Sequence, residues 1–110
     1  MVKPVAGEIV AIPFPRSDSA GGKRRPALVI ADLPGADLIL CQITSRGHWD
    51  SFAVPLDKSD CERGQLDGPC FIRPQRLFTV DQHVILHAIG KVTPEKFDEV
   101  FKRVHGLFVD

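Results

Sequence analysis

Nine prolines and nine glycines divide this chain of 110 residues into short segments. Proline cannot donate a hydrogen bond within a sheet or continue a helix, and glycine favours turns, so long regular elements are excluded over most of the chain. The segments between these residues are rich in aliphatic and β-branched side chains, which favours strands. The sequence predicts strands at residues 8–12, 26–31, 37–44, 51–56, 71–73, 77–80 and 87–92. The predicted fold is therefore mainly β, a small antiparallel barrel whose strand order stays open.

Prolines also suggest where the first strands begin and end. Pro13 is expected to stop the first strand, and Pro26 to occupy the first position of the second, where no ladder donor is lost. Between them, residues 16–24 contain a glycine pair and charged residues, which predicts an exposed loop. The segment 37–44 is continuously apolar at its start, which predicts a central strand buried on both faces.

One helix is predicted, at the carboxyl end of the chain. Thr93 can cap it, Pro94 suits its first position, Glu95 favours the positive end of the helix dipole, and Gly106 can end it. Five apolar residues recur at helical spacing, and cationic side chains fall in the last turn. The apolar set, expected to pack on the sheet, is Phe97, Val100, Phe101, Val104 and Phe108, and the cationic set is Lys102, Arg103 and His105.

Size and composition indicate one soluble domain spanning residues 1–110, with 44% hydrophobic and 25% charged residues. No stretch has the apolar length of a membrane span or the pattern of a secretory signal, so a cytoplasmic location is expected. The chain has three cysteines, an odd number at irregular spacings, at Cys41, Cys61 and Cys70. They are interpreted as reduced, inert thiols. His83 and His87 lie in a segment that reads as strand or turn, so neither a metal nor another cofactor is predicted.

The formal net charge is zero, which alone does not suggest a nucleic-acid partner. The distribution of charge is uneven, however, because Arg16, Lys23, Arg24 and Arg25 are accompanied only by Asp18 over ten positions. A neutral chain can therefore carry one positive face.

Three short segments carry candidate functional side chains. Arg24 and Arg25 stand where the glycine-containing loop meets a buried strand, a place where a guanidinium group can be held rigidly and still reach a ligand. Thr44 closes the third strand and could donate a hydrogen bond to a phosphate oxygen, and residues 73–76 form a second basic segment between strands. Each segment also has a structural interpretation without function. Arg24 and Arg25 can be a solvated run of charges, the Thr44 hydroxyl can cap a turn, and residues 73–76 can be a surface turn.

His48, in a polar loop beside Trp49, is a candidate acid or base next to a surface on which a nucleobase could stack. An exposed loop with a half-buried tryptophan is the alternative interpretation.

The order of these segments resembles the PemK/MazF-like toxins of type II toxin-antitoxin systems. The similarity runs through Gly7–Val10 and Pro13–Pro15, then Gly21–Ile30, then Asp37–Ser45. It continues in Arg73–Asp81 and in Ile89–Glu95, so it covers nearly the whole chain.

The resemblance implies an SH3-like barrel with a C-terminal helix, a homodimer, and a sequence-selective endoribonuclease that an antitoxin protein neutralises. Arg25 matches the family's active-site arginine, Thr44 matches its hydroxyl residue, and Arg73 matches an arginine of the Kid-like members. Two departures stand out, because Gln75 replaces the aspartate of those members and the first loop has no histidine. The general acid and base are therefore left unassigned.

The chemistry implied is attack of an RNA 2′-hydroxyl on the adjacent phosphate, which requires no metal. Expected substrates are single-stranded RNAs, whose bases can be read individually. The predicted RNA contacts are Arg16, Lys23, Arg24, Ser45, Arg46, His48, Gln75 and Arg76. A disordered acidic and apolar antitoxin segment is expected to cover the basic loop. The alternative function is a toxin of the same fold that binds a protein such as DNA gyrase, and a third is a degenerate member that only pairs with an antitoxin-like partner.

Overall fold

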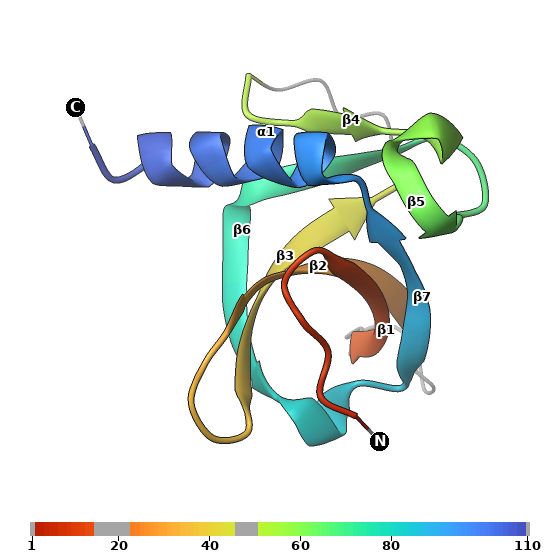
Figure 1. Ribbon diagram of the computed structural model, residues 1–110, viewed down its shortest axis with the longest axis vertical. Coiled ribbons are helices and arrows are strands. Elements are labelled where there is room, and N and C mark those ends of the chain that lie inside the picture. Colours follow the sequence, from red (N-terminus) through yellow and green to blue (C-terminus); the bar gives the residue numbers. More distant parts are fainter. Residues whose placement is uncertain (1, 15–22, 46–50, 110) are drawn as a thin grey trace.

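The computed structural model describes residues 2–14, 23–45 and 51–109 (Figure 1). Within these residues the strands form one antiparallel sheet of seven, in the order β4-β6-β3-β2-β1-β7-β5. The strands are β1 (Glu8–Phe14), β2 (Lys23–Asp32), β3 (Asp37–Thr44), β4 (Val54–Leu56), β5 (Cys61–Gly64), β6 (Cys70–Asp81) and β7 (His87–Val92). Two short 3₁₀ helices, η1 (Lys58–Asp60) and η2 (Gln82–Val84), and one α-helix, α1 (Pro94–Gly106), complete the described elements.

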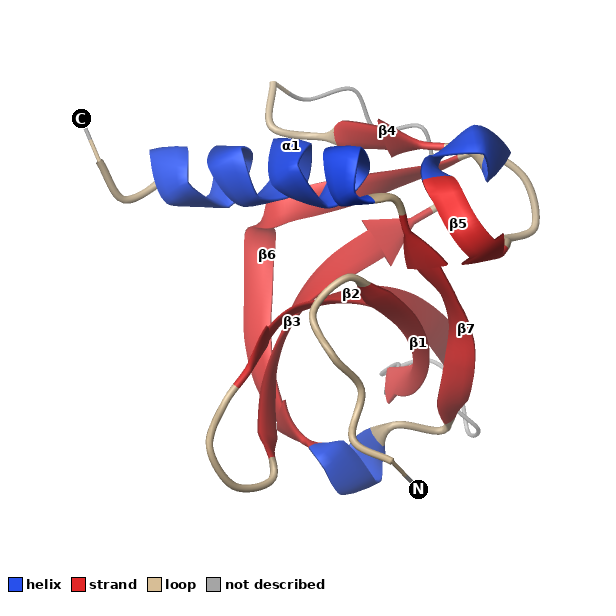
Figure 2. Ribbon diagram, in the orientation of Figure 1, coloured by secondary structure: helices blue, strands red, loops and turns tan. Residues whose placement is uncertain are grey.

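The sheet curls into a partly open barrel, with α1 lying beside β4 and β6 (Figure 2). Several strands curve, and β6 turns a corner along its length. At this corner Cys41 of β3 pairs with Leu77, whereas the next residue, Gln42, pairs with Arg73. Residues 74–76 therefore bulge out of the ladder, and a bulge bends a strand and increases its twist. The mainly β fold with a C-terminal helix is confirmed.

Both faces of the central strands are buried, in two separate apolar clusters. Successive side chains of a strand point to opposite faces, so Leu28 and Cys41 join one cluster while Ala27 and Leu40 join the other. The first cluster also contains Val100 of α1, whereas the second contains none of the described residues of α1. This double burial explains why segment 37–44 is apolar at consecutive positions, and it confirms the prediction of a central strand.

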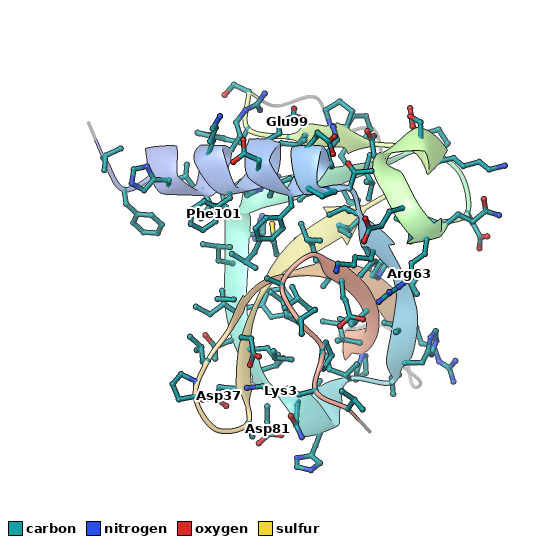
Figure 3. The ribbon with its side chains drawn as sticks, in the orientation of Figure 1. Lys3, Asp37, Arg63, Asp81, Glu99 and Phe101 are labelled. Atoms are coloured by element: carbon teal, nitrogen blue, oxygen red, sulfur yellow. The ribbon has the colours of Figure 1, made fainter. Side chains whose placement is uncertain are left out.

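The helix begins as predicted. Thr93 Oγ1 accepts a hydrogen bond from the backbone N–H of Lys96 at 3.1 Å, and Pro94 occupies the first turn. Val100 and Val104 are buried, as the apolar stripe predicts. Phe101 and Phe108 are not, since 47% and 75% of their surfaces stay exposed, and Figure 3 shows the Phe101 ring below the helix. The prediction that the whole stripe packs on the sheet is thus wrong for these two. The Phe101 ring stacks on Phe97 at a centroid distance of 6.1 Å, and Phe108 lies beyond the end of α1 at Gly106.

Pro13 and Pro26 lie inside strands and not at their ends, so both predicted boundaries are wrong. Pro13 pairs with Arg24, and Pro26 pairs with Ala11. Each proline has a ladder partner on one side only, because β7 pairs with β1 no further than Ala11 and the β2–β3 ladder starts at Ala27. A missing backbone donor costs little on an unpaired side.

Other boundaries differ where pairing partners decide them. The segments 71–73 and 77–80, predicted as separate strands, are one strand, so residues 73–76 are not a turn between strands. The predicted strand 51–56 shortens to Val54–Leu56. Cys61–Gly64 was not predicted, because it has no β-branched residue, but it pairs with β7.

The described part of the chain has no helix long and apolar enough to cross a bilayer.

Replacing Gly64 by alanine is expected to lower the free energy of unfolding by about 2–4 kcal/mol in urea titrations. Gly64 has a φ of +69°, and an added Cβ would stand 2.1 Å from the carbonyl oxygen of Ile89. Gly35→Ala is the matched control, since Gly35 has a similar φ of +81° but no atom within 4 Å of its Cβ position. Equal losses in the two variants would show that backbone strain alone, without the close approach of β5 to β7, sets the requirement.

Candidate functional site

The principal predicted side chains gather where β2 begins and β3 ends. Ala27 pairs with Gln42, and extending this register along both strands brings Arg25 opposite Thr44. Arg25 also pairs with Ile12 of β1. Residues far apart in the sequence therefore meet at one end of three adjacent strands.

The pairing of the strands also places three of the predicted side chains, Arg25, Thr44 and Arg73, on one face of the sheet. Paired residues of neighbouring strands point to the same side, and Gln42 pairs with Arg73 of β6. The partners Ile12 and Ala27 both belong to the second apolar cluster. Arg25, Gln42, Thr44 and Arg73 consequently share that side, and we call this set the Arg25 face. Only 7% of Thr44 is exposed, and Arg25 and Arg73 are half-buried.

An apolar cleft of about 410 Å³ adjoins the Arg25 face. Gln42 belongs to both, and Arg76 is exposed at the cleft. The other lining residues are Ile12, Pro13, Leu77, Phe78, Val80 and Val84. Gln75, at the β6 bulge, is half-buried with its Oε1 enclosed by protein. The cleft thus places an apolar surface next to two cationic side chains of β6.

A second hollow, of about 380 Å³, opens at the same strand ends but mostly on the other side of the sheet. We call it the strand-end pocket. Its polar lining consists of Arg24, Arg25, Ser45, Gln65, Asp67 and His87, and its apolar lining of Ala11, Pro26, Leu66, Cys70 and Ile89. Pro26 and His87 flank Ala11 as its two ladder partners, which fixes this side of the pocket.

Sequence reasoning predicted Arg24 and Ser45 in this neighbourhood but missed Gln65, Asp67 and His87. His87 was weighed only as a metal ligand. Gln65 and Asp67 stand in a stretch without strand or helix periodicity, so no pattern in the sequence pointed to them. The folded chain brings this stretch to the same pocket as the start of β2.

The His87 ring has one nitrogen in contact with the backbone. Its Nδ1 lies 3.3 Å from the carbonyl oxygen of Ala88. A carbonyl oxygen only accepts hydrogen bonds, so this contact requires the proton on Nδ1. In that tautomer Nε2 can accept a hydrogen bond, and the ring is exposed.

Several predicted contacts cannot be placed. Arg16, Arg46 and His48 lie outside the described residues, and Lys23 is described as part of β2 for its backbone only. Among the described side chains, no group of three or more His, Cys, Asp or Glu residues is arranged to hold a metal ion.

The Cys41 thiol holds the backbone at the start of the β6 bulge. Its Sγ donates a hydrogen bond to the carbonyl oxygen of Arg73 at 2.9 Å. Burial raises the pKa of Cys41 to about 12, and the bond to Arg73 lowers it only in part. Burial also raises the pKa of Cys61 and Cys70, and all three cysteines are free, as the sequence predicts.

These arrangements agree with a match to a known family. A model described as PemK-like, MazF-like toxin of type II toxin-antitoxin system matches residues 6–108. The chain belongs to this toxin family. The resemblance read from the sequence is thereby confirmed over the segments that carried it.

Solved structures share the fold of this PemK/MazF-like chain. A crystal structure of MazE-MazF from Deinococcus radiodurans is 22% identical, with a TM-score of 0.77 and coverage of 97% of both chains. An endoribonuclease in complex with its cognate antitoxin from a mycobacterial species is 17% identical, with a TM-score of 0.73 and coverage of 97% of both chains. The Mycobacterium tuberculosis toxin MazF-mt6 is 16% identical, with a TM-score of 0.71 and coverage of 92% of this chain and 95% of that one. None of the curated protein sequences matches.

Cys41 is expected to resist alkylation in the folded protein. A thiol with a pKa of about 12 is ionised in roughly one molecule in ten thousand at pH 8, and the thiolate is the reactive form. Iodoacetamide labelling followed by mass spectrometry should show Cys41 reacting about a thousandfold more slowly in buffer than in urea, where its pKa returns to that of a free thiol. Half-buried Cys61 serves as the internal reference, and labelling of folded Cys41 at the rate of Cys61 would contradict the role assigned to burial.

Proposed function

We propose that this chain is the toxin of a type II toxin-antitoxin system and acts as a metal-independent, sequence-selective endoribonuclease on single-stranded RNA. The observation that carries the proposal is the convergence of Arg25, Thr44 and Arg73, from three different strands, on one face. Family membership supports it independently.

The reaction needs no nucleophile from the protein. The 2′-hydroxyl of one ribose loses its proton and attacks the neighbouring phosphorus. The bond from phosphorus to the 5′-oxygen of the next nucleotide then breaks. That oxygen takes up a proton, and the products are a 2′,3′-cyclic phosphate and a 5′-hydroxyl. What the site must supply is stabilisation of the negative charge that develops on the phosphate oxygens.

The Arg25 face offers donors suited to this task. The Arg25 guanidinium has the planar donor geometry to bind two phosphate oxygens at once. The Thr44 hydroxyl, almost buried at the end of β3, can orient one oxygen, and Arg73 can assist on the leaving-group side. Because these groups are half-buried or buried, their hydrogen bonds act in a medium of lower dielectric constant than water.

Flanking cationic and polar side chains extend the proposed RNA contact beyond the cleaved bond. Arg76 lies at the apolar cleft, and Arg24 and Ser45 line the strand-end pocket, so RNA can be bound on both sides of Arg25. The other contacts predicted from the sequence are retained in this proposal. They are Arg16, Lys23, Arg46, His48 and Gln75.

A homodimer and a cognate antitoxin are the proposed protein partners. One of the similar structures is an endoribonuclease in complex with its cognate antitoxin and another is of MazE-MazF, which supports the second partner. For the first, η2 and the residues after it expose apolar side chains beside the cleft, with Val84 37% and Leu86 41% exposed. Burial of such a surface against a second copy would remove apolar area from water.

Arg25→Ala is expected to slow RNA cleavage by about a hundredfold or more, because it removes a positioned donor to the developing charge. Cleavage of a mixed-sequence single-stranded RNA in excess EDTA, with mapping of cut sites and end groups, measures this. Lys102→Ala is the matched control, since Lys102 lies on α1, where it forms an ion pair with Asp98 at 3.0 Å.

Cleavage by Arg25→Ala at the rate of the parent protein would contradict the proposed role of Arg25, and loss of activity in EDTA would contradict the metal-free reaction. Intact RNA with the folded parent protein, combined with inhibition of DNA supercoiling, would favour the gyrase-binding alternative. That alternative is retained because Gln75 replaces the aspartate of Kid-like members.

A further inference from the structure

The strand-end pocket is not required by the chemistry proposed for the Arg25 face. Arg24 and Pro26 project to the side of the sheet opposite Arg25, because successive residues of β2 alternate. Arg25 nevertheless lines the pocket as well, so the two sites meet at this residue. A nucleotide held in the pocket would therefore lie close to the phosphate held by Arg25.

The pocket combines an apolar wall with exposed polar groups at its mouth. Pro26, Leu66 and Ile89 supply flat or aliphatic surface, and Leu66 and Ile89 also pack against the first core cluster. Arg24, Ser45, Gln65 and Asp67 are all exposed. A ligand that fits has one planar, moderately apolar part and one anionic part, which is the composition of a nucleotide.

Asp67 is held in place by a tight turn. The backbone N–H of Gly68 donates to the carbonyl oxygen of Leu66 at 3.0 Å, and Gly68 has a φ of +85°, which favours glycine. Because Leu66 packs against the first core cluster, the turn fixes the backbone of Asp67, which lines the pocket next to Leu66. Positioned carboxylates of this kind read the donor edge of a base.

We propose that the strand-end pocket binds one unpaired guanine nucleotide of the RNA, next to the bond that is cleaved, with Asp67 reading the base. This inference rests on the proposed ribonuclease function and adds a specificity-determining residue to it.

Guanine fits better than the other bases because of its hydrogen-bonding edge. Its N1–H and N2–H₂ groups are adjacent donors, so one carboxylate accepts from both. Cytosine and adenine offer a single exocyclic amine beside an acceptor nitrogen, and uracil places its one donor between two carbonyl oxygens that repel a carboxylate. The Gln65 amide can donate to guanine O6, and Arg24 and Ser45 can bind the attached phosphate.

The test compares cut sites of the parent protein, Asp67→Asn and Asp98→Asn on an RNA pool of random sequence. Asp98→Asn is the matched control, because Asp98 is an exposed residue of α1. We expect the parent and Asp98→Asn to prefer guanine at one position beside the cut. In Asp67→Asn this preference is expected to be lower by about tenfold or more. A parent without guanine preference, or a preference unchanged in Asp67→Asn, would overturn the proposal.

A binding measurement separates this inference from the proposed activity. Guanosine 3′-monophosphate is added to the ¹⁵N-labelled parent, and amide shifts are followed at residues 65–68, 70 and 87–89, with uridine 3′-monophosphate as the comparison ligand. Shifts with the guanine nucleotide alone, absent in Asp67→Asn, would support the pocket even if the parent left RNA intact, an outcome that would remove the ribonuclease proposal only. Equal shifts with both nucleotides, or none, would overturn the guanine assignment.

Discussion

The bulge in β6 is the constraint on which the rest of the molecule depends. A ladder of constant register between β3 and β6 would stay nearly straight. Residues 74–76, between Arg73 and Leu77, have no partner in the β3–β6 ladder, and β6 bends there. The bent strand pairs with β3 along its length and with β4 near its start. The Cys41 thiol bonds to the carbonyl oxygen at the edge of this irregularity, which helps to satisfy a backbone acceptor there.

The same bulge decides where Arg73 stands. It keeps Arg73 paired with Gln42 and hence on the face of Arg25 and Thr44, while Leu77 pairs with Cys41 toward the first core cluster. A change of register by one residue would send each side chain of the strand to the other face. Core packing and the position of a proposed catalytic group are therefore set by one local feature.

Sequence patterns predicted the parts of this structure that local chemistry controls. The bounds of β3 and β7 agree with apolar runs ended by polar residues, and the start of α1 follows from Thr93 and Pro94. Patterns failed where a partner strand decides the outcome. The interior positions of Pro13 and Pro26 depend on where neighbouring ladders stop, and the strand Cys61–Gly64 exists because β7 offers it a free side. For the site, the resemblance singled out Arg25, Thr44 and Arg73, whereas Asp67 and His87 reach the strand ends only through tertiary structure.

The pairing of β1 with β7 joins the two ends of the barrel's sequence. During synthesis, β1, β2 and β3 can begin to pair as soon as they leave the ribosome, but the free side of β1 has no partner until β7 has been made. The pocket that contains both Arg24 and His87 is therefore absent from a chain in which β7 has not yet been made. A nascent chain, still attached to the ribosome, would thus lack part of its finished surface until β7 has emerged and paired with β1.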